Sequence, residues 1–130
     1  MISTREYISI LTPDVETAIN VPSEVSCISC SESSFAVGFW LGGTISIYNY
    51  AGDILHTEHL GVTTPPVSIM LTSFSYSCHV LVGLGDGKLI TYDYIDGLFL
   101  NKSQFQVGTH PAKLKRMEYA GSEIIFICSD

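Results

Sequence analysis

The sequence is short of basic residues. It holds 6 Lys and Arg against 13 Asp and Glu, a formal net charge of −7 over 130 residues. Nucleic acids are bound largely by lysine and arginine side chains that neutralise phosphates, so this composition argues against direct binding of nucleic acid. The one basic cluster is Lys113, Lys115 and Arg116. Alternation along a strand divides such a triplet between two faces, which favours a solvated strand over a site for an anionic partner.

Long apolar runs and helical patterns are also missing. No uninterrupted apolar stretch approaches 18 residues, so no membrane span is expected. The first residues show no basic segment followed by an apolar one, so no secretory signal is indicated and an intracellular protein is expected. Hydrophobic residues nevertheless make up 46% of the chain, too many for a disordered protein. We therefore expect a folded protein that buries most of its elements.

Patterns typical of metal sites and active sites are scarce. Cys27 and Cys30 form a C-x-x-C pair, but residues three apart on a strand point to opposite faces, which favours separate thiols over a shared metal. The segment from Gly83 to Lys88 resembles a phosphate-binding loop, yet a strand follows where such a loop needs a helix. No serine or cysteine can be paired with a general base. We expect a non-enzymatic protein with no cofactor and no metal.

The sequence does contain an internal repeat of about 45 residues, the period expected of four-stranded repeat units. Val37 and Gly38 in the first copy correspond to Val82 and Gly83 in the second. After a one-residue gap the correspondence continues, and it pairs Gly43 with Gly87, Tyr48 with Tyr92, and Tyr50 with Tyr94.

Within each copy, short runs of β-branched and aromatic residues alternate with turn signals. Asp86-Gly87 predicts a two-residue type I′ hairpin, a turn that needs positive φ at both central positions. Gly42-Gly43 occupies the same place one repeat earlier, so these four residues are predicted to form structural turns. Strands are predicted over residues 6–11, 15–20, 25–30, 34–40, 44–50, 53–60, 66–72, 79–84, 88–94, 98–107, 112–118 and 123–128.

Four strands in each repeat predict an all-β fold, a partial β-propeller of WD-like four-stranded antiparallel blades, about three blades' worth. Within residues 1–130 we expect the end of one blade at 1–22, blades at 23–62 and 63–108, and the start of a further blade at 109–130. A β-sandwich is the alternative. Because closed propellers usually have four to eight blades, we expect a piece of a longer protein or a reduced gene product that needs partners.

Trp40 is the one candidate binding residue that the pattern itself suggests. It is the only tryptophan, and it ends a predicted strand just before the Gly42-Gly43 turn, near the rim of a propeller. Large aromatic side chains at such rims often anchor protein partners. The other interpretation is a packing residue between blades.

Several stretches occur together in an order and spacing that resemble a known family. They are Ser23–Ile28, Val37–Trp40, Leu84–Leu89, Val107–Pro111 and Phe126–Asp130. Through them the chain is similar to the second propeller of the large subunit of the damaged-DNA-binding complex, and the resemblance extends over nearly the whole chain, weakly over the first 22 residues. That superfamily also includes the large subunits of splicing factor 3b and of the cleavage-polyadenylation complex.

The resemblance implies a non-catalytic adaptor of a cullin-RING ubiquitin ligase, linked to DNA damage and found in the nucleus and cytoplasm. In the family the second propeller docks on the N-terminal region of a cullin, and other parts of the full-length protein hold substrate receptors. Trp40 falls on the aromatic residue near the cullin-facing surface, so Trp40 and Leu41 are the expected partner-binding residues. The family usually has Thr-Asp after that tryptophan, where this chain has Leu41-Gly42.

Two alternatives for the function stay open. The chain could be a scaffold segment of a splicing or mRNA 3′-end-processing complex, which predicts co-purification with subunits of those complexes. It could also be a stand-alone β-sandwich binding module, which requires a clustered polar pocket.

Overall fold

The computed structural model describes residues 2–3, 7–11, 16–21, 24–40, 43–74 and 77–129. Within them the all-β prediction is confirmed, and every predicted strand is present, with its ends at or within two residues of the predicted ones. No helix among these residues has the length and apolar character to cross a membrane. The strands are β1 (Ile2–Ser3), β2 (Tyr7–Leu11), β3 (Glu16–Asn20), β4 (Val25–Cys30), β5 (Ser34–Phe39), β6 (Thr44–Asn49), β7 (Ile54–His59), β8 (Pro66–Phe74), β9 (Ser77–Leu84), β10 (Lys88–Ile95), β11 (Leu98–Gln106), β12 (Lys113–Tyr119) and β13 (Ser122–Cys128).

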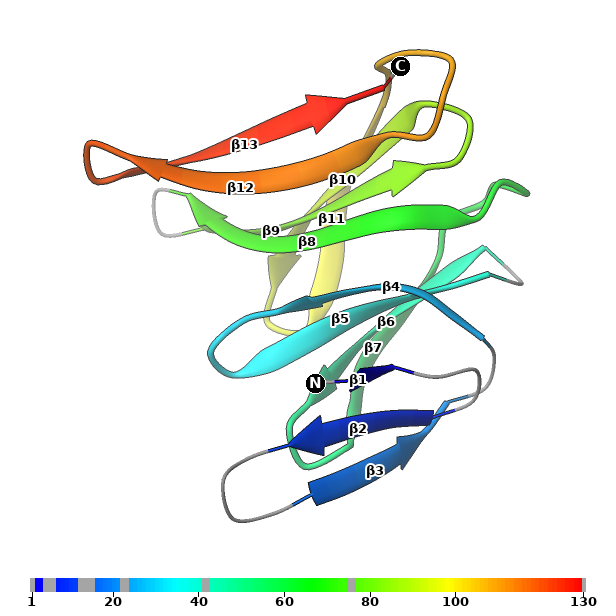
Figure 1. The fold of residues 1–130 in the computed structure, drawn as a ribbon, viewed down its shortest axis with the longest axis vertical. Coiled ribbons are helices and arrows are strands. Elements are labelled where there is room, and N and C mark those ends of the chain that lie inside the picture. The colour runs from blue at the N-terminus through cyan, green and yellow to red at the C-terminus, as the bar shows by residue number, and fades with distance from the viewer. Residues whose placement is uncertain are drawn as a thin grey trace.

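The strands form four antiparallel sheets that follow one another along the chain. Strands β4–β7 make one four-stranded sheet, called here the first blade, and β8–β11 make another, called the second blade. A three-stranded sheet, β1–β3, precedes them, and a two-stranded sheet, β12–β13, follows them. Figure 1 shows the four sheets succeeding one another from the bottom of the view to the top. Successive small sheets are the arrangement of propeller blades, and the β-sandwich alternative is not observed.

Burial changes from strand to strand across each blade. All six residues of β5 are buried, although an antiparallel sheet with one face in water would alternate between buried and exposed residues. The outermost strands β7 and β11 are mostly exposed. The middle strands therefore lie between two neighbouring sheets, which explains the nearly continuous apolar sequence from Phe35 to Phe39.

Two hydrophobic clusters fill the spaces between the sheets. The larger cluster joins the two blades and contains Ile45 and Ile47 of the first blade together with Val82, Ile90 and Tyr92 of the second. The smaller cluster joins the first blade to the preceding sheet, and it is formed by Ile8, Ile19, Val21, Phe35, Val37, Phe39 and Tyr48. Most of the core therefore lies between blades, which is how repeat units stabilise one another.

The innermost strands of successive sheets are also joined by serine side chains. The backbone N–H of Leu71 in β8 donates to Oγ of Ser29 in β4, at 3.2 Å. The backbone N–H of Leu114 in β12 donates to Oγ of Ser68 in β8, at 3.1 Å. Each bond satisfies a part-buried amide that has no neighbouring strand at that edge. A serine side chain therefore fixes the spacing between the first and second blades and again between the second blade and the sheet β12–β13.

Candidate protein-interaction site

Trp40 lies directly after β5, at the turn toward β6. Its backbone N–H donates to the carbonyl oxygen of Glu24 at 3.0 Å, which ties this turn to the connection before β4. The side chain is 44% exposed, whereas Phe39 beside it is buried. The indole is therefore partly in solvent on a backbone that is held in place. Leu41 and Gly42, which follow in the sequence, lie outside the described residues.

The equivalent position in the second blade is Gly85. Its backbone N–H donates to the carbonyl oxygen of Pro65 at 3.1 Å, which repeats the bond from Trp40 to Glu24. The two positions therefore carry the same backbone bond to the connection that enters their blade. Since Gly85 has no side chain, the backbone hydrogen bond that both blades make here does not require an indole at this position. This contrast favours a surface role for Trp40 over packing between blades.

Gly43 and Gly87 occupy equivalent turn positions as well. Both have positive φ, 57° and 88° respectively. Their carbonyl oxygens accept the backbone N–H of Leu60 at 2.8 Å and of Val107 at 2.9 Å. A Cβ at Gly43 would lie 2.5 Å from the Val62 carbonyl oxygen, and one at Gly87 would meet the Gly108 carbonyl oxygen. Each glycine allows the connection after its blade to cross close to the turn.

The turn at Asp86-Gly87 differs from the predicted type I′ hairpin. Strand β9 ends at Leu84 and β10 begins at Lys88, so three residues form the loop. The Gly87 N–H donates to the Leu84 carbonyl at 3.2 Å, and positive φ occurs at Gly87 but not at Asp86. This is a type I turn closed by a glycine bulge. Two-residue loops with positive φ at both positions occur instead at Asp96-Gly97 and Ala120-Gly121.

The Asp86 carboxylate is used within this turn. It accepts the backbone N–H of Lys88 at 3.2 Å and the hydroxyl of Thr64 at 3.3 Å, and it lies 3.6 Å from the Lys88 ammonium group. The side-chain amide of Gln106 donates to the Asp86 carbonyl oxygen at 3.0 Å. Asp86 therefore connects its turn to the connection before β8 and to the strands β10 and β11, which is a structural role.

The turns of the two blades gather at one end of the strands. Because neighbouring strands are antiparallel, Gly43 and the loops 60–65, 85–87 and 107–112 all lie at the end that carries Trp40. The turns 31–33, 50–53, 96–97 and 120–121 lie at the other end. A partner approaching Trp40 would therefore meet a surface made of turns and connections, with a single large aromatic side chain among the described residues of the loop after β5.

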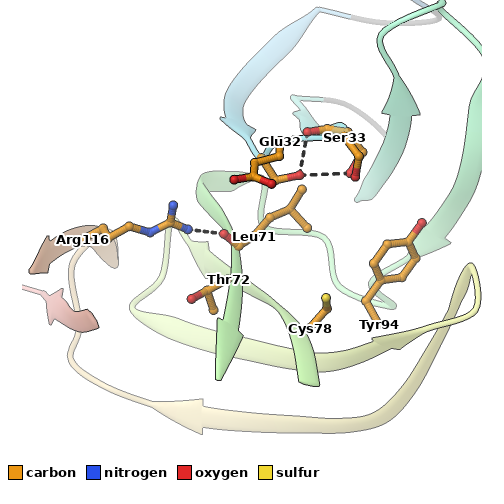
Figure 2. Close-up of a pocket in the computed structure, with 9 residues that line it drawn as sticks. Glu32, Ser33, Leu71, Thr72, Cys78, Tyr94 and Arg116 are labelled. Atoms are coloured by element: carbon orange, nitrogen blue, oxygen red, sulfur yellow. Dashed lines mark hydrogen bonds between the residues drawn. The ribbon is translucent and has the colours of Figure 1, made fainter. Parts of the chain in front are cut away.

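A shallow pocket of about 410 Å³ lies at the opposite end, between the sheets. Figure 2 shows Arg116 turned toward the carbonyl oxygen of Leu71, to which its guanidinium donates, with Tyr94 on another side of the space. Burial and, to a lesser extent, the neighbouring Cys78 raise the pKa of Tyr94, which keeps this phenol neutral. Among the described residues, no group of three or more His, Cys, Asp and Glu could hold a metal ion.

One polar network was not foreseen from the sequence. His79 Nδ1 lies 2.9 Å from Asp93 Oδ1, and the Asn101 side-chain amide donates to Asp93 Oδ2 at 2.8 Å. These bonds lower the pKa of Asp93, the bond from Asn101 most and that from His79 next. Asn101 has a φ of 53°, in a bulged part of the pairing between β10 and β11. No sequence pattern marks such a bulge, and the network links the three strands β9, β10 and β11.

Taken together, the successive four-stranded sheets and the turn surface around Trp40 define a β-propeller domain with an exposed aromatic residue on a fixed turn. The family model described as RSE1/DDB1/CPSF1 second β-propeller matches residues 3–130. The chain therefore belongs to this family, as its resemblance to the second propeller indicated.

Curated relatives agree with this assignment. DNA damage-binding protein 1 of Drosophila melanogaster is 30% identical over 98 residues, which cover 73% of this chain and 9% of that protein. The protein of the same name from Oryza sativa subsp. japonica is 25% identical over 123 residues, covering 86% of this chain and 11% of that protein. The chain thus spans between 9% and 11% of the length of these relatives.

A solved structure supports the fold alone. A crystal structure of BBS1N in complex with ARL6DN, soaked with lead, is similar to this chain with a TM-score of 0.66 at 20% sequence identity. The similarity covers 86% of this chain and 38% of that one.

Proposed function

We propose that this chain is a non-catalytic protein-interaction scaffold, a segment of an adaptor of a cullin-RING ubiquitin ligase linked to the DNA-damage response. In this proposal the N-terminal region of a cullin binds at the end of the strands that carries Trp40, and Trp40 and Leu41 are the partner-binding residues. Substrate receptors would be held by the full-length protein, in the nucleus and cytoplasm.

The observation that carries this proposal is the contrast between Trp40 and Gly85. The two positions make the same backbone hydrogen bond, but only the first blade places a large aromatic side chain there, 44% exposed. Exposed tryptophans on rigid backbone are typical anchors of protein interfaces, because they add a large contact area at a small cost in conformational entropy. The fixed turn of Trp40 meets that requirement.

The charge of the chain and its family membership both support a protein as the partner. The net charge of −7 is unfavourable for binding phosphates, so contact with a protein fits the chain better than contact with DNA. The family includes scaffold-type large subunits, and the curated relatives carry the name DNA damage-binding protein 1. For this chain we infer that any link with damaged DNA passes through partner proteins.

The family description favours one second candidate. It groups RSE1 and CPSF1 with DDB1, so a scaffold role in a splicing or mRNA 3′-end-processing complex follows from the same family membership. Both candidates use the propeller as a docking surface. They differ in the proteins that would co-purify with the chain.

Affinity purification from cells, followed by mass spectrometry, distinguishes the candidates. Recovery of a cullin and ligase subunits that is lost in Trp40→Ala and kept in Tyr119→Ala supports the adaptor proposal. Tyr119 is a suitable control because it is an exposed aromatic residue, 70% accessible, at the other end of the strands. Recovery of splicing or polyadenylation subunits without a cullin would contradict the adaptor proposal and favour the second candidate.

A further inference from the structure

Trp40 has a charged neighbour directly across the strand pair. Val25 of β4 pairs with Phe39 of β5, and the bond from the Trp40 N–H to the Glu24 carbonyl oxygen continues this pairing by one step. Residues directly opposite each other on antiparallel strands project to the same side, with Cβ atoms about 5 Å apart. The carboxylate of Glu24 and the indole of Trp40 therefore extend from neighbouring points on one side of the two strands.

Both side chains are exposed at the surface. Trp40 is 44% exposed, and Glu24 is exposed as well. Among the residues that the structure describes, no aromatic ring or cation stacks on the indole. Within the same part of the chain, the Glu24 carboxylate takes part in no ion pair. The pair thus offers an aromatic face and an uncompensated negative charge next to each other.

The second blade carries neither side chain at the equivalent positions. There the same backbone hydrogen bond joins Gly85 to Pro65, one step beyond the pair of Leu84 and Pro66. A bond that forms equally between glycine and proline requires neither an indole nor a carboxylate. Only the first blade combines the two groups, so the backbone does not account for their combination.

An acidic residue at the same end of the second blade is used internally. The Asp86 carboxylate accepts the Thr64 hydroxyl and the backbone N–H of Lys88, and it lies 3.6 Å from the Lys88 ammonium group. The charge of Asp86 is therefore already compensated, whereas that of Glu24 is not. The chain as a whole has a net charge of −7, which also favours a cationic group on a partner at this surface.

We propose that Trp40 and Glu24 together form a site for an arginine side chain of the protein partner. This inference rests on the proposed function, because it names the group through which a partner engages the turn surface around Trp40. The guanidinium is planar and weakly hydrated, so it stacks on the indole while its N–H groups donate to the Glu24 carboxylate. A lysine fits less well, because its compact ammonium group lacks both the planar face and the fork of donors.

Fluorescence of the 130-residue chain tests this proposal, because Trp40 is its only tryptophan and reports directly on the site. A tetra-arginine peptide at low ionic strength should quench or shift the emission. Glu24→Gln keeps the backbone bond and should weaken the binding at least about fivefold, which corresponds to roughly 1 kcal/mol. Glu32→Gln is the matched control, since it removes the same charge from an exposed turn at the other end of the strands.

A tetra-lysine peptide should bind more weakly than the tetra-arginine peptide. Equal responses to the two peptides would overturn the proposal, and so would equal affinities of the Glu24→Gln and Glu32→Gln variants for tetra-arginine. Unchanged emission up to about 10 mM tetra-arginine, where even a ligand of millimolar affinity saturates its site, would overturn it as well.

Titration with the N-terminal region of a cullin separates this inference from the proposed function. Glu24→Gln should weaken cullin binding too, and the difference from the wild type should shrink as the salt concentration rises to about 0.5 M. Cullin binding that depends on Trp40 but not on Glu24 would overturn the arginine site and leave the proposed function in place. A Glu24-dependent response to tetra-arginine without cullin binding would support the arginine site and contradict the proposed function.

Discussion

In the first blade the residue that follows the second strand is Trp40, and in the second blade the same place holds Gly85. Around this difference the two blades agree closely. The backbone N–H of each residue donates to the connection that enters its blade. A glycine of positive φ follows in both blades, Gly43 three residues after Trp40 and Gly87 two residues after Gly85. Where the blades agree, the shared residue is explained by the backbone. Where they differ, the backbone does not account for the indole of Trp40, which is the side chain that we propose to contact a partner.

The largest expected effect tests a feature that the blades share. At Gly87 φ is 88° and an added Cβ would meet the Gly108 carbonyl, whereas at Gly97 φ is 77° and no atom lies within 4 Å of the added Cβ. Both replacements by alanine strain the backbone by about 1–2 kcal/mol. Only Gly87→Ala adds a clash with the backbone, for a total loss of about 3 kcal/mol in the free energy of unfolding. Urea unfolding of both variants measures the difference, and equal losses would contradict the close-approach explanation.

The next effect concerns the buried tyrosine that both blades have. Burial, with a smaller contribution from the charge of Glu58, raises the pKa of Tyr92 from 10.0 to about 12. Between these pH values the unfolded chain loses the phenolic proton and the folded chain keeps it. The free energy of unfolding should therefore fall as the pH rises from 10 to 12, by up to about 1.4 kcal/mol per pH unit.

Tyr92→Phe should remove this part of the alkaline destabilisation. At neutral pH the same variant should be as stable as the wild type or slightly more stable, because the Tyr92 hydroxyl is buried without a hydrogen-bond partner. Thermal unfolding as a function of pH measures both effects. Tyr119→Phe, at an exposed position, is the control, and an equal response of the two variants would show that burial of Tyr92 is not the cause.

Smaller effects are expected at the serine bonds between innermost strands. Ser29→Ala and Ser68→Ala should each cost about 1 kcal/mol, because each leaves a part-buried backbone N–H without its acceptor. The two variants should differ in where the fold loosens. Hydrogen exchange should rise in β12 and β13 for Ser68→Ala only, since Ser68 holds β12 and Ser29 holds β8. The same exchange pattern in both variants would contradict this assignment.

The smallest effect on stability is expected at Trp40. The side chain is 44% exposed, and the position of residue 40 is set by its backbone hydrogen bond to Glu24, which alanine keeps. Trp40→Ala should therefore change the free energy of unfolding by less than about 1 kcal/mol. A loss of several kcal/mol in urea unfolding would support the interpretation of Trp40 as a packing residue between blades.

The sequence predicts the regular parts of this fold well. The repeated Gly43 and Gly87, and the repeated Tyr48 and Tyr92, indicate blades because both copies need the same turn and the same buried aromatic ring. What could not be predicted depends on contacts between distant segments. The bonds from Leu71 to Ser29 and from Leu114 to Ser68 join strands more than forty residues apart, so no local pattern reveals them.

Local geometry limited the prediction of turns and of the candidate site in the same way. Asp86-Gly87 has the sequence of a type I′ turn, but Asp86 keeps negative φ because its carboxylate accepts hydrogen bonds from Thr64 and from the backbone of Lys88. Two-residue strands such as β1 are too short to leave a pattern. For the site, the sequence identified Trp40 as an aromatic residue at a rim. The repeat aligns it with Gly85, but the backbone hydrogen bond that both positions make is seen only in the structure.

The most direct test of the account is a calorimetric titration of the chain with the N-terminal region of a cullin. The account predicts that the wild-type chain binds, that Trp40→Ala weakens the affinity by about thirtyfold, as expected for an aromatic anchor worth roughly 2 kcal/mol, and that Tyr119→Ala binds like the wild type. Equal affinities for all three proteins, or no binding by the wild type, would contradict the proposal that the turn surface around Trp40 is the docking site for a cullin.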